Sequence, residues 1–295
     1  MSGGRVLRDA LTTQTVLRLL ENARYEVLPT PATEAKVIQH LPRDRVVTVT
    51  ASPSKGLEAT LELSGRLARH GYVVVPHLAA RMISGRAELA EIVDRLTGQG
   101  INQVFVPAGD ADPVGDYRDA LSLLEELARM DAPFGRIGIT GYPESHPSIH
   151  DDVTVQSMWD KRLHATHIVS NLTFSAAVVR TWITRLRARG VTTPVLLGVP
   201  GPVERSKLLA MATKIGVGQS TRFLAKNKGL FARITAPGGF TGERFVLDCA
   251  QWVGDPSARV EGLHVFTFNQ IAETEMWRAE LVGRLRGQGQ PWLAQ

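Results

Sequence analysis

Cysteine is almost absent from this sequence, since its 295 residues include only Cys249. A single thiol excludes an internal disulfide, the device on which small secreted domains rely, so we expect a reducing compartment. The apolar residues Leu247 and Ala250 flank this cysteine in a stretch that has a helical pattern. The pattern predicts an unreactive thiol in the core rather than a nucleophile.

Long apolar runs and clusters of basic residues are also missing. No apolar run reaches the roughly 18 residues of a membrane helix, and the first residues lack the pattern of a signal peptide. The 34 basic and 29 acidic residues leave a net charge of +5 with no basic cluster, which argues against nucleic-acid binding. A mild positive charge suits an anionic small substrate or a nucleotide. We therefore expect a cytoplasmic protein with small-molecule partners.

Several strong catalytic signatures are absent as well. No group of His, Cys and Asp has the spacing of a zinc site, and there is no Gly-x-Ser-x-Gly elbow. The predicted strand ends carry no lysine, which argues against a Schiff-base aldolase.

What the sequence does contain is a repeated alternation of short β-branched runs with helical patterns. One strand plus one helix takes about 30 residues, and eight such units close a (β/α)8 barrel of about 250 residues. The predicted strands are 25–28, 46–50, 72–77, 104–106, 137–140, 167–171, 195–198 and 263–269. The predicted helices are 57–68, 87–96, 118–130, 176–189, 204–215 and 242–253.

This alternation predicts an α/β fold, a single-domain TIM barrel over residues 21–285. The first 20 residues are expected to form a short helix outside the barrel, and 286–295 a tail. The glycine-rich region 216–262 breaks the rhythm and is expected to form an elaborated loop plus a helix near the barrel mouth.

In a (β/α)8 barrel the chemistry lies at the carboxyl ends of the strands, so the polar residues there are the candidates. Glu26 lies at the end of the first strand among apolar neighbours; burial would raise its pKa and suit a general acid, although a carboxylate facing water is an equal alternative. Asp110 could bind a heterocycle or cap a helix. His77 could contact a phosphate or cofactor or be a satisfied strand-end histidine, and Asn171 suits a heterocycle edge.

Five segments, in order and spacing, resemble the methylenetetrahydrofolate reductases, and the resemblance covers roughly residues 20–282. The Tyr-Pro-Glu-x-His-Pro pattern is the most distinctive of them. The segments are 25–29, 75–78, 109–113, 141–147 and 266–269.

The resemblance implies reduction of 5,10-methylenetetrahydrofolate to 5-methyltetrahydrofolate, a step of one-carbon metabolism and methionine biosynthesis. Glu26 matches the family's general acid, and Asp110 matches the aspartate that binds the pterin and stabilises the cation. Asn171 falls where the family has a pterin-binding glutamine, and Phe268 lies in the last matching segment, as a substrate-binding residue. Positions that contact flavin in relatives match Thr50, His77, Tyr142 and Lys161.

Departures from the family concern the flavin site. Ala108 and Gln270 stand where relatives have arginines, and Thr154 stands near a position that is acidic in relatives. Each lost arginine–diphosphate contact removes roughly 1.5–3 kcal/mol of binding free energy. We therefore expect NADH (or NADPH) to pass hydride directly to the folate, without bound FAD. The alternatives are an FAD-dependent methylenetetrahydrofolate reductase, another pterin- or flavin-dependent reductase, and a non-catalytic folate-binding relative.

Overall fold

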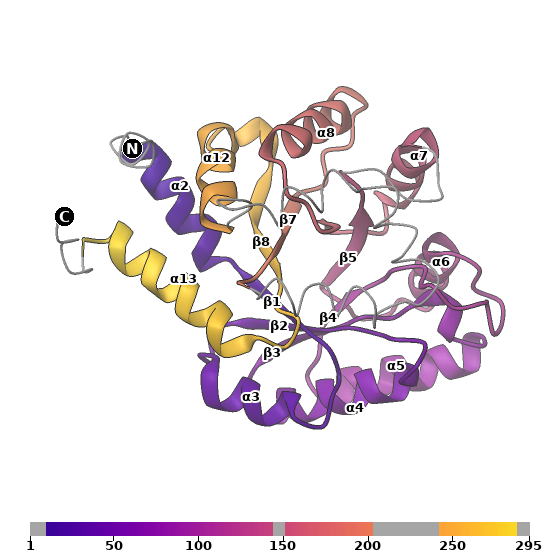
Figure 1. Ribbon diagram of the computed structural model, residues 1–295. Helices are drawn as coiled ribbons and strands as arrows, with labels where there is room; N and C mark the ends of the chain where they lie inside the picture. The colour runs from indigo at the N-terminus through magenta and orange to yellow at the C-terminus, as the bar shows by residue number, and fades with distance from the viewer. Residues whose placement is uncertain (1–9, 144–150, 203–241, 288–295) are drawn as a thin grey trace.

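The computed structural model describes residues 10–143, 151–202 and 242–287, which form one barrel of parallel strands surrounded by helices (Figure 1). The fold class predicted from the sequence is confirmed. The strands are β1 Arg24–Val27, β2 Val46–Val49, β3 Val73–Pro76, β4 Gln103–Phe105, β5 Arg136–Gly141, β6 His167–Ser170, β7 Val195–Pro200 and β8 Val260–Phe266.

The eight strands follow the order β3-β2-β1-β8-β7-β6-β5-β4, so the first and last strands of the chain are neighbours. Closure between β3 and β4 depends on a parallel bridge between His77 and Phe105. The Leu78 N–H donates to the Phe105 carbonyl at 2.8 Å, and Ala80 and Arg81 continue the pairing beyond the strands. The ends of β3 and β4 are thereby held together at the barrel mouth.

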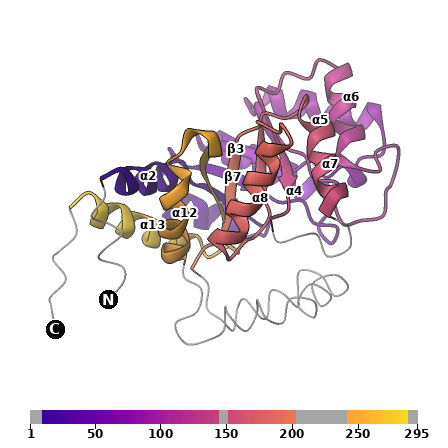
Figure 2. The same cartoon turned by 90° about the horizontal axis from the view of Figure 1, so that it is seen from above.

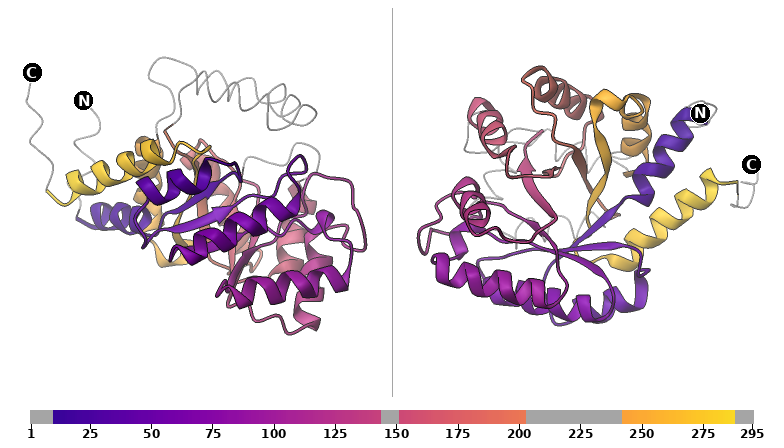
Figure 3. Two further views of the ribbon diagram at one scale, coloured as in Figure 1. Left: turned by 90° about the horizontal axis from the view of Figure 1, so that it is seen from below. Right: turned by 180° about the vertical axis from the view of Figure 1, so that it is seen from behind.

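Helices alternate with the strands and form the outer layer, which encircles the barrel when it is seen from behind (Figure 3). The α-helices are α2 Ala10–Glu21, α3 Thr33–His40, α4 Gly56–Arg69, α5 Arg86–Gly98, α6 Ala120–Arg129, α7 Asp151–Lys161, α8 Ala176–Ala188, α12 Gly242–Val253 and α13 Ile271–Leu285. Two short 3-10 turns, η1 Ala80–Met82 and η2 Pro256–Ala258, complete the described elements.

Two apolar cores follow from the period-2 alternation of the strands. The larger one lies between strands and helices and contains Tyr25, Val27 and the buried faces of the helices. The smaller one fills the barrel interior with Val75, Phe105 and Val169, joined by Leu196. Arg24 and Glu26 alternate with the outward-facing Tyr25 and Val27, so both point into the barrel.

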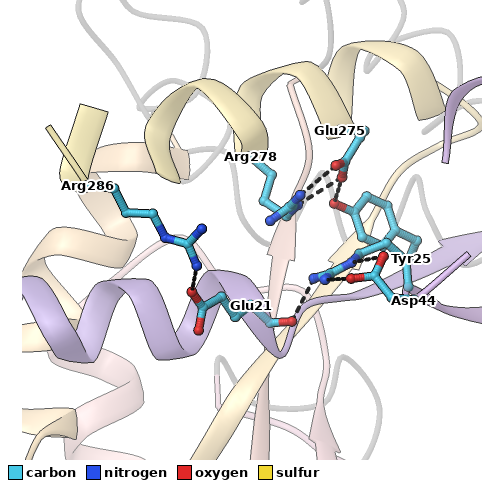
Figure 4. Close-up of polar contacts among 7 residues, drawn as sticks. Glu21, Tyr25, Asp44, Glu275, Arg278 and Arg286 are labelled. Atoms are coloured by element: carbon cyan, nitrogen blue, oxygen red, sulfur yellow. Dashed lines mark hydrogen bonds and ion pairs between the residues drawn. The ribbon is translucent and has the colours of Figure 1, made fainter. Parts of the chain in front are cut away.

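The described helices α2, α12 and α13 pack together on one side of the barrel, as Figures 1 and 2 both show. Tyr25 reaches out from β1 and donates its hydroxyl hydrogen to Glu275 of α13, which Arg278 also binds (Figure 4). Arg286 pairs with Glu21 at the end of α2. These contacts tie the strand that carries Glu26 to the helix that follows β8.

The expected N-terminal helix corresponds to α2, whose Val16, Leu19 and Leu20 are fully buried. Cys249 is also buried, as predicted, and burial raises the pKa of its thiol. The expected helix 204–215 and the glycine-rich part of 216–241 lie outside the described residues. No helix in the described ranges is long and apolar enough to cross a membrane.

Candidate active site

Glu26 is the centre of a buried polar group inside the barrel. Its Oε2 lies 2.9 Å from His264 Nε2, on the neighbouring strand β8, and 3.8 Å from His77 Nε2, just after β3. The Glu26 side chain keeps 17 % of its surface exposed, whereas His264 is almost completely buried. The carboxyl group is therefore enclosed by imidazoles but open on one side.

The pKa of Glu26 is lowered, contrary to the expectation that burial would raise it. Burial is the largest single effect and favours the neutral acid. The hydrogen bond from His264 and the charges that His264 and His77 can carry together outweigh it. The prediction was wrong because the sequence could not place a hydrogen-bond donor against the carboxylate.

His77 behaves as a neutral imidazole at physiological pH. Burial lowers its pKa to about 4, despite the attraction of the Glu26 carboxylate. Its ring packs 4.6 Å from that of Phe105, in the pair that closes the barrel. Within the part of the chain described, three buried polar atoms near this centre have no hydrogen-bond partner: His77 Nε2, His264 Nδ1 and Thr48 Oγ1. Thr48 is paired in register with Glu26, so its hydroxyl adds to the polar lining.

A clamp from the segment after β8 holds the backbone around Glu26. Thr267 Oγ1 donates to the Glu26 carbonyl at 2.6 Å. The Asn269 side chain accepts from the Leu28 N–H at 2.8 Å and donates to the Leu28 carbonyl and to Thr33 Oγ1. Phe268 and Asn269 both adopt positive φ angles, of 49° and 59°, in the left-handed region that L residues rarely occupy. The hydrogen bonds of the Thr267 and Asn269 side chains offset the free-energy cost of these backbone conformations.

A second polar group lies at the ends of β4 and β5. Asp110 follows Gly109, whose φ is 87°, and its side chain is exposed. Burial raises the pKa of Tyr142, and the charge of Asp110 acts in the same direction. A hydrogen bond between Tyr142 and Thr140 lowers this pKa but does not outweigh burial. Asp110 and Tyr142, predicted separately, are therefore close together, while the rest of the Tyr-Pro-Glu-x-His-Pro pattern, 144–147, lies outside the described residues.

Asn171 lies at the end of β6 with an exposed side chain. Its Oδ1 accepts a hydrogen bond from the Leu172 N–H at 2.8 Å, so the amide oxygen is already used within the local turn. The carbonyls of Ser170 and Asn171 press against Gly198 of β7, where an added Cβ would lie 2.1 Å and 2.8 Å from them. Glycine at 198 thus allows the two strand ends to approach.

The remaining predicted residues are dispersed. Thr50 follows β2 with a buried hydroxyl that has no partner among the described residues, and Phe268 lies in the strained segment after β8. Lys161 is the last residue of α7, in the helix layer, where burial lowers its pKa to about 8 in spite of Asp119 and Asp160. The described contacts do not bring Lys161 to the Glu26 centre.

Comparison with known proteins identifies the family. The protein-family model described as methylenetetrahydrofolate reductase matches residues 35–276 of this chain. The chain belongs to the methylenetetrahydrofolate reductase family. It is therefore a folate-related reductase, and the resemblance noted in the sequence is confirmed.

Solved structures of similar shape have low sequence identity. The GH18 chitinase ChiB from the chitin utilization locus of Flavobacterium johnsoniae has a TM-score of 0.49 and 11% identity, covering 90% of this chain and 93% of the chitinase chain. Dihydropteroate synthase from Thermus thermophilus, in complex with 6HMPPP, has a TM-score of 0.48 and 12% identity, covering 90% of this chain and 92% of the synthase chain. Neither structure identifies a substrate for this chain.

Sequence reasoning missed His264 and the clamp residue Asn269. Both belong to the last predicted strand, 263–269. Alternation along this strand was a usable signal for His264, because it places His264 and Phe266 on the inner face of the barrel, between the outward-facing Leu263 and Val265.

Proposed function

We propose that this protein reduces 5,10-methylenetetrahydrofolate to 5-methyltetrahydrofolate with NADH (or NADPH) as the hydride donor. Family membership supports the folate reaction. The main structural support for this reaction is the enclosed Glu26 carboxyl group, which can act as an acid and has one oxygen held by His264.

Glu26 is proposed as the general acid. Its proton passes to a nitrogen of the five-membered ring, the ring opens to an iminium cation, and hydride then reduces the exocyclic methylene to a methyl group. The balance is one folate, one NADH and one proton giving methylated folate and NAD⁺. A bound pterin would cover the exposed part of the carboxyl group, and this further desolvation favours the protonated acid that the step requires.

Asp110 and Tyr142 are proposed to receive the pterin and the nicotinamide at the ends of β4 and β5. An ionised Asp110 lies on the exposed side of the mouth, where it would attract the iminium cation. Asn171 and Phe268, at the ends of β6 and β8, complete the proposed pterin site, while Thr50 and His77 directly follow β2 and β3. Lys161 is the weakest of these proposed contacts, because it lies in the helix layer.

Hydride is proposed to pass directly from the nicotinamide, without FAD. The residues at two diphosphate positions do not fit FAD, because Ala108 offers a methyl group and Gln270 an amide in place of arginines. The neighbouring Arg81 contacts Ala108 through its backbone N–H, and its Nε donates to the Arg118 carbonyl at 2.8 Å. Direct transfer requires only that the donor and acceptor carbons approach to roughly 3–3.5 Å.

The decisive experiment measures NADH oxidation by extensively desalted protein with 5,10-methylenetetrahydrofolate, with and without added FAD. We expect oxidation that depends on the folate and not on FAD. Activity only with FAD would retain the reaction and reject direct transfer. Absence of activity in both conditions would favour a folate-binding relative that has lost catalysis.

A variant pair tests the acid. Glu26→Gln keeps the shape of the side chain and removes its proton, so kcat should fall by at least about 100-fold, the lower range of general acid catalysis. Glu280→Gln, exposed on α13, is the control and should retain full activity. Circular dichroism should show the same fold for both, and a wild-type rate in Glu26→Gln would remove Glu26 from the mechanism.

A further inference from the structure

The two nitrogens of His264 have different surroundings. Nε2 lies 2.9 Å from Glu26 Oε2, whereas Nδ1 is buried without a hydrogen-bond partner among the described residues. When Glu26 is ionised, a neutral ring with its hydrogen on Nδ1 would point the Nε2 lone pair at a carboxylate oxygen, which is repulsive. The hydrogen therefore belongs on Nε2, from which it donates to Glu26.

Both histidines of the centre approach the same carboxyl oxygen. Oε2 faces His264 Nε2 and His77 Nε2, and Oε1 takes no hydrogen bond from the described residues. The ring of Phe266 stands edge-on to His264 at 4.9 Å between centroids and helps fix the imidazole. Oε1 is thus the oxygen left to exchange a proton with a substrate, while Oε2 stays bound to the protein.

Charge develops on this carboxyl group only as its proton leaves. A hydrogen bond to a carboxylate is stronger than one to a neutral acid, so a donor at Oε2 stabilises the transition state more than the ground state. We propose that His264 is a positioning residue for Glu26, whose Nε2–H orients the carboxyl group and stabilises the charge left on Oε2 when Oε1 gives its proton to the folate. This inference rests on the proposed function and deepens it.

Other titratable groups near the pair do not supply the same effect. Glu26 is faced by His264 from β8 and by His77 from the end of β3, and the charge of His264 in turn acts on His167 of β6. Burial lowers the pKa of His77 to about 4 and that of His167 to about 2, so both are neutral near pH 7. His77 also lies 3.8 Å from Oε2, beyond hydrogen-bond distance. The donor to Glu26 is therefore His264.

Three substitutions of His264 separate the effect of its hydrogen bond to Glu26 from the effect of its packing. His264→Gln keeps an N–H near the position of Nε2, His264→Leu removes the donor and keeps apolar bulk, and His264→Asn is polar but too short to reach Glu26. We expect His264→Leu and His264→Asn to lower kcat by about 10- to 100-fold, the range for a hydrogen bond to a charged group. His264→Gln should stay within about threefold of the wild type.

The pH profile gives a readout that a purely structural role would not change. The acid form of Glu26 is required, so kcat/KM falls as pH rises through its pKa. Loss of the donor should move this basic limb to higher pH by roughly one unit in the Leu and Asn variants, and the Gln variant should restore its position. If the pH at which kcat/KM decreases is the same as in the wild type in both His264→Leu and His264→Asn, the proposal is overturned.

A direct titration of Glu26 needs no substrate. Carbon NMR of glutamate labelled at Cδ, assigned with Glu26→Gln, should give a higher pKa for Glu26 in His264→Leu and His264→Asn than in the wild type. If it does so while the wild type fails to oxidise NADH, the hydrogen bond from His264 to the Glu26 carboxylate is supported and the proposed function falls. If the wild type is active and this pKa is the same in all variants, the positioning role is rejected. Circular dichroism controls for folding, and the Asn variant serves if the Leu variant fails to fold.

Discussion

Glu26 shows how neighbouring histidines together reverse the effect of burial on a carboxyl group. Desolvation alone would favour the neutral acid, yet the hydrogen bond from His264 at 2.9 Å, with the charges of His264 and His77, brings the pKa of Glu26 below its ordinary value. The group is therefore ionised in the free protein and must take up a proton with the substrate. This is compatible with an acid that has to leave a stable carboxylate beside a cation.

At the residue scale, the charge of Asp110 can be tested against a close neighbour. Asp110→Asn keeps the size of the side chain and removes its attraction for the proposed cation, so kcat/KM for the folate should fall about 10-fold or more. Asp112→Asn, equally exposed two residues later, is the control and should have little effect. Steady-state kinetics on both variants check this, and equal losses would show that the charge of Asp110 has no special role.

At the element scale, the segment after β8 is what fixes the end of β1. Asn269 reaches Leu28 and Thr33 from a strained backbone position, and Thr267 binds the Glu26 carbonyl. The sheet order explains this arrangement, because β1 and β8 are neighbours although they lie at opposite ends of the sequence.

Two substitutions of Asn269 separate its hydrogen bonds from its backbone strain. Asn269→Gly removes the side-chain clamp but suits a positive φ, and Asn269→Ala removes the clamp while keeping the strain. Both should lower kcat because Glu26 loses its support, and Ala should be less stable than Gly by about 1 kcal/mol in urea unfolding. Equal stability would mean that the left-handed conformation relaxes once the clamp is gone.

Contact between β6 and β7 gives a second prediction at this scale. Gly198→Ala would place its Cβ 2.1 Å from the Ser170 carbonyl oxygen, so the strand ends must separate. We expect a loss of about 2–4 kcal/mol in the free energy of unfolding. Gly98→Ala, at the end of α5 with nothing within 4 Å, is the matched control and should be neutral or slightly stabilising. Urea titration of both variants decides the matter.

At the scale of the whole molecule, a polar layer joins opposite sides of the barrel below the Glu26 centre. Arg24 of β1 donates to His167 Nε2 of β6 at 3.2 Å, and His167 Nδ1 contacts Thr166 Oγ1 at 2.9 Å. Arg136 of β5 pairs with Glu261 of β8 at 2.9 Å. Burial, with the adjacent arginines, lowers the pKa of His167 to about 2, so the folded barrel holds this imidazole neutral.

The barrel should therefore lose stability in acid. The unfolded chain protonates His167 near pH 6.5 and the folded chain only near pH 2, so stability is complete above about 6.5 and decreases as pH falls. By pH 4.5 the loss is on the order of 2–3 kcal/mol for this residue. His167→Gln keeps an acceptor for Arg24 without titrating and should reduce the pH dependence in urea unfolding, leaving the part that His77 contributes. The exposed His40→Gln should leave the slope unchanged.

Much of the architecture was predictable because strands and helices have different periods. β-branched runs alternating with helical patterns located the strands to within a few residues, and helix 242–253 was predicted with the bounds it has. The sequence left open whether Glu26 faces the barrel or water, and the structure places it on the inner face, between the outward-facing Tyr25 and Val27. Lys161 shows the limit, since a matched position in a helix does not say how far the side chain lies from the mouth.

The sequence by itself determined the barrel, the family and the candidate residues at the strand ends, because these depend on periodicity and on local motifs. Only the tertiary structure decided which residues meet. His264 lies 238 positions from Glu26 along the chain, yet closure of the barrel brings β8 beside β1. The proton affinity of Glu26 depends on that contact, because electrostatic interactions follow distance in space and not distance in sequence.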